Sequence, residues 1–146
     1  MRIAVVDASV VGKWLLPGEA DSPGAARLIE DHRMRRVALI APHVLEHEVT
    51  SMIWKAVREG RVSPDASTEI LLRARSLGIM YGSGSQTSLD TLSLSNSLRQ
   101  TPYDCSYLAV ALEIGCNLYT ADRRFAAAAR EAYQCVKDIE DYPGEN

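Results

Sequence analysis

The stretch Ile3-Ala4-Val5-Val6-Asp7 decides how the rest of the sequence is interpreted. Four apolar residues in succession, with no polar alternation, are typical of a strand that is buried on both faces of a parallel sheet. Such a strand requires neighbouring strands of the same kind and helices that cover both faces. The stretch therefore predicts an α/β fold, and it places the carboxylate of Asp7 at the carboxyl end of the first strand.

Comparable strand signals recur along the chain and alternate with helical patterns. The further predicted strands cover residues 37–40, 79–81, 117–120 and 135–136. The predicted helices cover residues 9–16, 44–59, 89–99, 104–114 and 123–133, and two more open at Ser22-Pro23 and Ser63-Pro64. Prolines in the first helical turn and glycines after the last turn mark several of these boundaries.

The alternation of strands and helices predicts the architecture of the whole chain. We expect a single-domain α/β/α sandwich over residues 1–146, with a mainly parallel sheet of about five strands. The junction Gly82-Ser83-Gly84-Ser85 is flexible but too short to separate two domains. A loose polar tail is expected over residues 141–146.

The composition fits one globular domain and excludes several classes of protein. Of the 146 residues, 47% are apolar, which is too many for a disordered chain. The 19 acidic and 16 basic residues give a net charge of −3, which argues against a general basic surface that coats nucleic acid. No apolar run approaches the roughly 18 residues of a membrane span. Three cysteines without a CxxC spacing, and no signal-peptide pattern, indicate a cytoplasmic protein with no membrane partner.

Carboxylates stand where a parallel sheet places its ligand sites. Asp7 and Asp122 follow two predicted strands, and Asp104 stands at the start of a predicted helix. Each has an ordinary alternative role, because aspartate caps helices and is favoured by the helix dipole. On the helix over 44–59, Glu46 and Glu48 flank the apolar stripe on opposite sides, and the helical period does not choose between them.

Together these residues predict several carboxylates at one edge of the sheet. Carboxylates that gather repel one another unless a cation neutralises them. An all-oxygen ligand set suits Mg²⁺ or Mn²⁺, and such a site can activate water and stabilise an in-line displacement at phosphorus. The residues alone thus favour metal-dependent hydrolysis of phosphodiester bonds.

A local string offers a competing interpretation. His43-Val44-Leu45-Glu46-His47 matches the H-x-x-E-H pattern of inverted zinc metalloproteases, with the two histidines one helical turn apart. Three fixed residues are easily matched by chance, and a zinc site here leaves the aspartates at the strand ends unexplained. A zinc metalloprotease is therefore retained only as an alternative.

Four segments occur in an order that resembles the PIN-domain ribonucleases. They are VVDASVVGKW over residues 5–14, EVTSMIWKA over 48–56, YDCSYLAVA over 103–111 and LYTADRRF over 118–125. Each segment is short, but the ordered set extends over nearly the whole chain. Within that family the chain most resembles the VapC-type toxins of prokaryotic toxin–antitoxin pairs.

The resemblance implies a site of four acidic residues, with Glu48 rather than Glu46 as the ligand on the long helix. Asp7, Glu48, Asp104 and Asp122 are then the catalytic residues, and they hold Mg²⁺ or Mn²⁺. The implied activity is that of an endoribonuclease that hydrolyses RNA. The resemblance also implies a PIN-like sandwich, commonly a homodimer, and an antitoxin protein that occupies the active-site groove.

Polar residues beside the acids complete the expected site. Ser9 and Thr120 would position water or a carboxylate, although capping of a helix or strand end is an equal alternative. Arg123 and Arg124 would hold phosphates of the substrate. Ser51 stands where the family often has asparagine, three residues after the glutamate, and its side chain has a shorter reach. A non-catalytic PIN-like module that binds a partner through the same groove is the alternative function.

Overall fold

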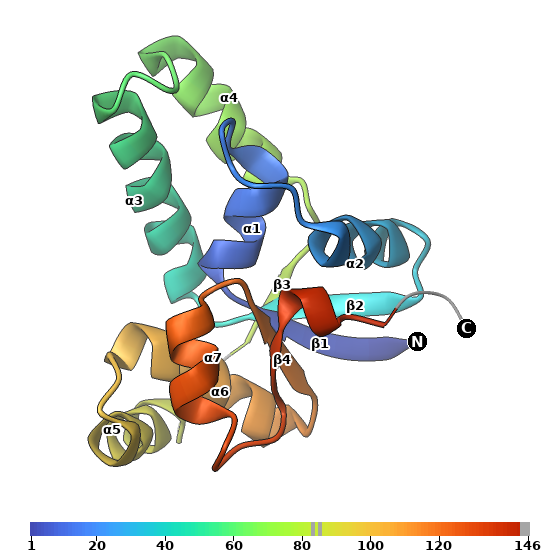
Figure 1. Ribbon diagram of the computed structural model, residues 1–146, viewed down its shortest axis with the longest axis vertical. Helices are drawn as coiled ribbons and strands as arrows, with labels where there is room; N and C mark the ends of the chain where they lie inside the picture. Colours follow the sequence, from blue (N-terminus) through green and yellow to red (C-terminus); the bar gives the residue numbers. More distant parts are fainter. Residues whose placement is uncertain (83, 85, 144–146) are drawn as a thin grey trace.

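In the described part of the chain, five parallel strands form one sheet with the order β3-β2-β1-β4-β5 (Figure 1). The strands are β1 (Arg2–Val6), β2 (Val37–Ala41), β3 (Met80–Tyr81), β4 (Asn117–Thr120) and β5 (Val136–Asp138). The computed structural model describes residues 1–82, 84 and 86–143. Residues 83 and 85 of the predicted junction, and residues 144–146 of the predicted tail, lie outside the described residues. The predicted α/β fold with a parallel sheet is confirmed.

Seven α-helices and one short 3-10 helix are present in the described residues. They are α1 (Ala8–Leu15), α2 (Pro23–Arg33), α3 (Val44–Arg58), α4 (Pro64–Arg75), α5 (Thr87–Leu98), α6 (Pro102–Ile114), α7 (Arg123–Ala129) and η1 (Ile139–Asp141). Helix α6 begins earlier than predicted, because the Thr101 hydroxyl caps it. Helix α7 ends before the predicted Tyr133, because the chain turns there to bring β5 beside β4. None of the described helices is long and apolar enough to span a bilayer.

The direction in which strands are added to the sheet reverses after β3. From β1 the chain moves outward to β2 and β3, and it then crosses back to β4, on the other side of β1, and on to β5. Crossover connections between parallel strands are right-handed, so α1–α4 and α5–α7 cover opposite faces. Figure 1 shows α1 to α4 above the sheet and α5 and α6 below it. The connections after β1 and β4 therefore leave in opposite directions, and the carboxyl ends of two such strands are where parallel sheets place their ligand sites.

The core lies on both faces of β1, as the apolar run predicts. Val5 and Val6 are 0% exposed. Leu28 of α2 and Leu108 of α6, which lie on opposite faces of the sheet, are also 0% exposed. Burying one side chain of this size contributes about 1.5–3 kcal/mol. The end of β1 that precedes Asp7 is thus firmly packed in the core.

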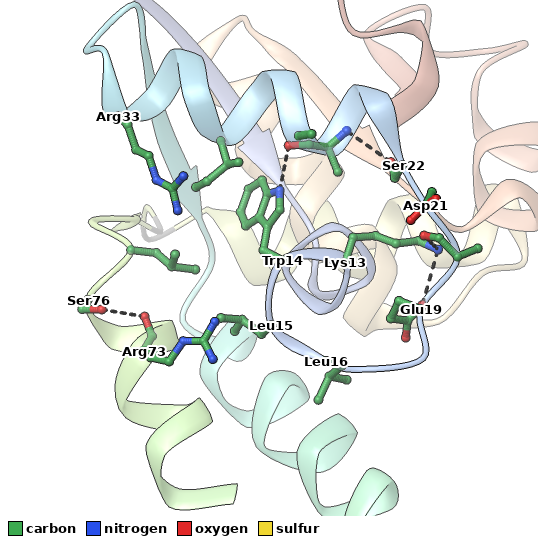
Figure 2. A pocket seen from close by; sticks show the side chains of 15 residues that line it. Lys13, Trp14, Leu15, Leu16, Glu19, Asp21, Ser22, Arg33, Arg73 and Ser76 are labelled. Carbon is green, nitrogen blue, oxygen red and sulfur yellow. Dashed lines mark hydrogen bonds and ion pairs between the residues drawn. The ribbon is translucent and has the colours of Figure 1, made fainter. Parts of the chain in front are cut away.

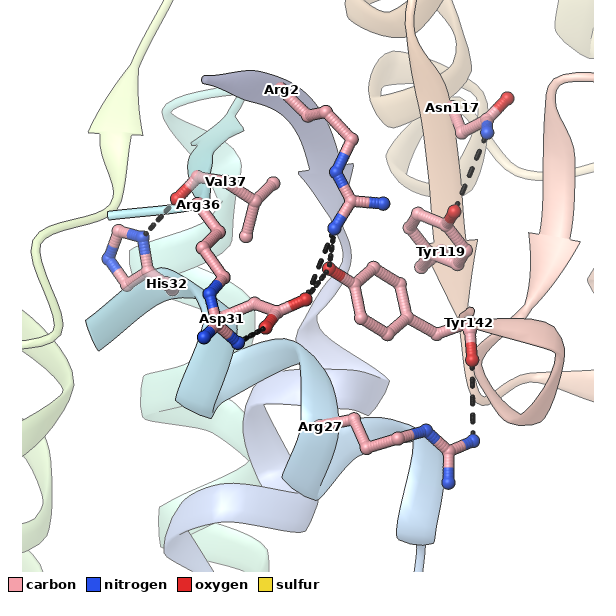
Figure 3. Close-up of polar contacts among 9 residues, drawn as sticks. All are labelled: Arg2, Arg27, Asp31, His32, Arg36, Val37, Asn117, Tyr119 and Tyr142. Carbon is pink, nitrogen blue, oxygen red and sulfur yellow. Dashed lines mark hydrogen bonds and ion pairs between the residues drawn. The ribbon is translucent and has the colours of Figure 1, made fainter. Parts of the chain in front are cut away.

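A polar cluster ties the C-terminal segment to the amino ends of the strands (Figure 3). The buried Asp31 of α2 accepts a hydrogen bond from the Tyr142 hydroxyl at 2.7 Å, and it pairs with Arg2 at 3.1 Å and Arg36 at 3.2 Å. Tyr142 is itself buried and packs edge-on against Tyr119, with ring centroids 5.1 Å apart. The chain is therefore held at residues 141 and 142, where a loose tail was expected to begin.

Asp31→Asn is expected to destabilise the fold by about 2 kcal/mol at pH 7. The amide can still accept from the Tyr142 hydroxyl, but that hydrogen bond is no longer to a charged group, and the ion pairs with the partly exposed Arg2 and Arg36 are lost. The Tyr142 hydroxyl, followed by Arg36 and Arg2, lowers the pKa of Asp31 despite its burial. Because the pKa is lowered in the folded protein, the ionised carboxylate contributes its full stability at pH values above the ordinary pKa of aspartate. This contribution is lost as the pH falls through the pKa of Asp31 in the folded protein.

Denaturant unfolding at pH 7 and pH 3 measures this effect, and the gap between the wild type and Asp31→Asn should narrow in acid. The exposed Asp21→Asn is the matched control, with an expected change below about 0.5 kcal/mol. An equally large gap at both pH values would contradict a contribution from the ionised carboxylate.

Candidate active site

Asp7 lies at the carboxyl end of β1, beside the carboxyl end of β4. It follows β1 directly and caps α1, where its Oδ1 accepts a hydrogen bond from Val10 N at 3.3 Å. The same oxygen accepts from Ser9 Oγ at 2.5 Å, and Oδ2 accepts from Thr120 Oγ1 at 2.5 Å. Asp7 is thus a helix cap, as the ordinary alternative expects, and its second oxygen is turned toward β4.

Two hydroxyls hold this carboxylate between the strand ends. Thr120 is fully buried at the end of β4, and its Oγ1 also accepts from Asp122 N at 3.0 Å. Ser9 Oγ accepts from Ala121 N at 2.8 Å and lies 3.3 Å from Thr120 Oγ1. Both side chains therefore position the Asp7 carboxylate while they also satisfy the backbone after β4.

The environment of Asp7 disfavours its charged form. Burial raises the pKa of Asp7 to about 6, and the nearby charge of Asp104 adds to the rise, while the hydroxyls of Ser9 and Thr120 oppose it. An anion in such a place is stabilised when positive charge is brought close to it. The carboxylate is thus fixed in position, and within the described part of the chain its hydrogen bonds come from hydroxyls and a backbone N–H, not from a cationic side chain.

Glu48 reaches the same region from α3, the helix that follows β2. Its Oε1 accepts a hydrogen bond from the Tyr107 hydroxyl at 2.6 Å. Burial raises the pKa of Glu48, the Tyr107 hydroxyl opposes the rise, and the charge of Asp104 adds to it. Tyr107 is buried within α6 and fixes the direction of the glutamate.

Tyr107 is a functional residue of this region that the sequence pattern alone did not predict. The available signal was its position three residues after Asp104, which places both side chains on neighbouring parts of one helical surface. An apolar core position explains the buried ring equally well, so the hydroxyl contact with Glu48 could only be found from the structure.

Asp104 and Asp122 lie at helix N-termini. Asp104 is in the first turn of α6, where its backbone N–H donates to Thr101 Oγ1 at 3.2 Å. Burial raises the pKa of Asp104, and the charge of Asp122 adds to the rise. Asp122 caps α7, with its Oδ1 accepting from Phe125 N at 3.0 Å. The partial positive charge of a helix N-terminus favours anions at both positions.

Asp104 couples the four acids electrostatically. Its charge raises the pKa of Asp7 and of Glu48, and the charge of Asp122 in turn raises the pKa of Asp104. Oxygen ligands that repel one another in this way fit a hard divalent cation. Among residues 1–82, 84 and 86–143, no three His, Cys, Asp or Glu side chains converge closely enough to form a ready-made metal site. The donor chemistry therefore fits Mg²⁺ or Mn²⁺, although the described side chains do not yet form a complete ligand set.

The family model for the PIN domain matches residues 4–131, a range that contains all four acids. The chain belongs to the PIN domain family. Ribonuclease VapC3 from Pyrobaculum aerophilum is 27% identical over 124 residues, which are 84% of this chain and 91% of that protein. This PIN domain is thus a distant homologue of the VapC ribonucleases.

Two solved structures share the fold of this PIN domain. The crystal structure of PAE2754 from Pyrobaculum aerophilum has a TM-score of 0.69 and 24% identity, and the match covers 95% of this chain and 92% of that chain. Mycobacterium tuberculosis VapC20, described as a Sarcin-Ricin loop cleaving toxin, has a TM-score of 0.59 and 14% identity over 86% of this chain and 95% of its own. The likeness confirms the PIN-like sandwich with its five-stranded parallel sheet.

The remaining predicted residues of this PIN domain lie around the acids. Arg123 and Arg124 are exposed in the first turn of α7, directly after Asp122. Ser51 is exposed on α3, and it lines a cavity of about 490 Å³ together with Glu48. All three side chains are therefore accessible from solvent near the carboxylates.

The H-x-x-E-H string does not form a zinc site in the described part of the PIN domain. The ring of His43 stacks on Tyr81, with centroids 5.7 Å apart. Glu46 Oε1 accepts a hydrogen bond from Arg75 Nε at 2.8 Å, so its carboxylate already has a cationic partner. These contacts engage two of the three fixed residues in other ways, and the metalloprotease alternative is not supported.

A second cavity, of about 530 Å³, lies among α1, α2 and the end of α4 (Figure 2). Trp14 forms part of its wall and donates from Nε1 to Ala25 O at 2.8 Å. Arg33 and Arg73 line it from α2 and α4. None of the four acids lines this cavity, so it is separate from the candidate active site.

Proposed function

We propose that this PIN domain is a metal-dependent endoribonuclease and the toxin of a toxin–antitoxin pair. The observation that carries the proposal is the buried carboxylate of Asp7, held between the ends of β1 and β4 within reach of the charge of Asp104. The PIN family match, whose range contains all four acids, supports it. The distant homology to Ribonuclease VapC3 supports RNA as the substrate. The proposed cofactor is Mg²⁺ or Mn²⁺, the proposed partners are an antitoxin protein and a second copy of the chain, and the proposed compartment is the cytoplasm.

The four acids are the proposed catalytic residues and metal ligands: Asp7, Glu48, Asp104 and Asp122. When bound, a divalent cation supplies Lewis acidity, which favours ionisation of an attacking water and offsets charge that develops at phosphorus. Ser9 and Thr120 hold the Asp7 carboxylate through their hydroxyls. The exposed Arg123 and Arg124 bind phosphates of the RNA on either side of the reacting group.

Cleavage of labelled single-stranded RNA by the full chain tests the enzymatic function. We expect cleavage with Mg²⁺ or Mn²⁺, none in EDTA, and a loss of at least about a hundredfold in Asp104→Asn. Thermal unfolding of the variant serves as the control for folding. RNA binding without cleavage under all these conditions would favour the non-catalytic module, and cleavage in EDTA would contradict the proposed cofactor.

Induced expression in a bacterial host tests the toxin role. We expect growth to stop and new RNA ends to accumulate with the wild type, and neither effect with Asp104→Asn. Sequencing of those ends identifies the RNA target. Unchanged growth, together with metal-dependent cleavage in vitro, would contradict the toxin role and leave the ribonuclease in place.

Tyr107→Phe is expected to weaken the proposed metal site without unfolding the protein. The variant retains the buried ring but loses the hydroxyl that orients Glu48, so we expect the Mn²⁺ concentration for half-maximal cleavage to rise by about tenfold. The lost hydrogen bond should cost about 1 kcal/mol of stability. Cleavage measured against Mn²⁺ concentration gives the first value, and denaturant unfolding gives the second. An unchanged metal requirement would show that Tyr107 acts only in packing.

A further inference from the structure

A cavity adjoins the candidate active site along α3. It has a volume of about 490 Å³, and its walls include His47, Glu48, Ser51, Met52 and Lys55 of α3 and Tyr103 at the start of α6. The volume lies within the range of roughly 300–1,000 Å³ that is typical of small-molecule sites. Glu48 belongs both to this cavity and to the acid cluster, so an occupant would lie directly beside the proposed reaction centre.

Three hydrogen-bond donors follow one line along the cavity. His47, Ser51 and Lys55 are spaced four residues apart on α3, so their side chains lie on one face of the helix. The Lys55 side chain is 72% exposed, and its Nζ lies 3.9 Å from the Glu59 carboxylate. An ion pair this long and exposed is weak, which leaves the ammonium group accessible to a phosphate.

The opposite wall supplies an aromatic surface. Tyr103 directly precedes Asp104, and it is 61% exposed, so one face of its ring is open to a ligand. Met52 adds a half-buried apolar side chain to the same cavity. Apolar walls with a tyrosine ring suit a flat, aromatic ligand, because bases stack on exposed aromatic side chains.

We propose that this cavity binds one nucleobase of the RNA, next to the phosphate that is cut. This inference rests on the proposed ribonuclease function and adds the place where the substrate is recognised. Tyr103 stacks on the base, and Ser51 and His47 donate hydrogen bonds to its edge. Lys55 contacts the adjoining backbone phosphate. The combination of donors, one accessible ammonium and a stacking ring fits a nucleotide better than an apolar protein surface.

RNA binding by the full-length chain tests the stacking contact. The Kd for fluorescein-labelled single-stranded RNA is measured in the Asp7→Asn background, with EDTA present to prevent cleavage. Adding Tyr103→Ala should raise the Kd by about tenfold or more, whereas Tyr103→Phe should change it by less than about twofold. Trp54→Ala is the control, because it removes an exposed ring from the part of α3 beside α4.

The proposed contacts of Lys55 and Ser51 are tested separately, by the salt dependence of RNA binding and by the base preference of cleavage. Lys55→Ala should reduce the slope of log Kd against log salt concentration by about 0.7, which is the value for one phosphate of a single strand. Sequencing the products of a randomised RNA should show a base preference beside the cut in the wild type. That preference should weaken in Ser51→Ala, and an unchanged preference would remove Ser51 from the base contact.

The outcomes separate this inference from the proposed function. Equal Kd values for Tyr103→Ala and Tyr103→Phe, or an equal loss in Trp54→Ala, would overturn the nucleobase site even if the wild type cleaves RNA. A change of oligomeric state in Tyr103→Ala with an unchanged Kd would also overturn it, and would assign the cavity to a second copy of the chain. If the wild type does not cleave RNA but Tyr103→Ala still weakens RNA binding, the nucleobase site would be retained and the ribonuclease function rejected.

Discussion

Asp7→Asn is expected to lower metal-dependent RNA cleavage by at least about a thousandfold. Asp7 is the most buried of the four acids, and three hydrogen bonds hold its carboxylate between the ends of β1 and β4. Asparagine occupies the same volume but carries no charge to attract a cation. The hydroxyls of Ser9 and Thr120 can rotate to meet the new amide, so the fold should be retained.

The stability of Asp7→Asn should depend on pH in a way that identifies the buried charge. Burial raises the folded-state pKa of Asp7 to about 6. The protonated carboxyl therefore contributes its full stability at pH values below the ordinary pKa of aspartate. This contribution is lost as the pH rises through about 6. Asparagine does not titrate. In EDTA at pH 8 the variant should be more stable than the wild type by about 3 kcal/mol, and the gap should close near pH 4.

Rapid-quench cleavage assays with Mn²⁺ and denaturant unfolding at both pH values measure the two effects. Saturating Mn²⁺ should stabilise the wild type by about 2–3 kcal/mol at a hundred times its Kd, and should leave Asp7→Asn unchanged. This second readout does not depend on RNA. Cleavage by Asp7→Asn at the wild-type rate would remove Asp7 from the proposed site, and equal stabilisation of both proteins by Mn²⁺ would place any bound cation elsewhere.

Gly24→Ala is expected to cause the largest loss of stability, about 3 kcal/mol, which corresponds to a fall of about 10 °C in Tm. Gly24 lies in the first turn of α2 against η1, where an added Cβ would overlap the carbonyl oxygen of Ile139. That neighbour is backbone and cannot rotate away. The Gly24 N–H also donates to Glu140 Oε2 at 3.3 Å, so a shift of α2 would break a contact with the C-terminal segment.

Gly12→Ala is the matched control for this substitution. Gly12 is also a buried helical glycine, but an added Cβ there would first meet the terminal methyl group of Met52, a flexible side chain. The gain in helix propensity of up to about 1 kcal/mol should offset part of the crowding. Denaturant unfolding at pH 7 compares the two variants. A smaller loss in Gly24→Ala than in Gly12→Ala would show that η1 yields to the added atom.

Local patterns were sufficient to predict the layers of the fold. The continuous apolar run before Asp7 identified a doubly covered strand, because burial on both faces removes the polar alternation. Ser22 and Ser63, each followed by proline, marked helix starts correctly, since a cap needs only the residues of its own turn. Tyr142 shows the limit of such patterns, because its burial depends on Asp31, more than a hundred residues earlier.

The two glutamates of α3 show most clearly what the sequence determined by itself and what only the tertiary structure decided. The helical period placed Glu46 and Glu48 on opposite flanks of the apolar stripe and could go no further, because it is a property of one helix alone. In the structure the flank of Glu46 faces α4, where Arg75 pairs with it, and the flank of Glu48 faces α6, where it meets Tyr107. The sequence thus determined which residues share a strand or a helix face. The neighbour of each face, and therefore the membership of the acid cluster, was decided by the order of the strands, which depends on contacts between distant segments.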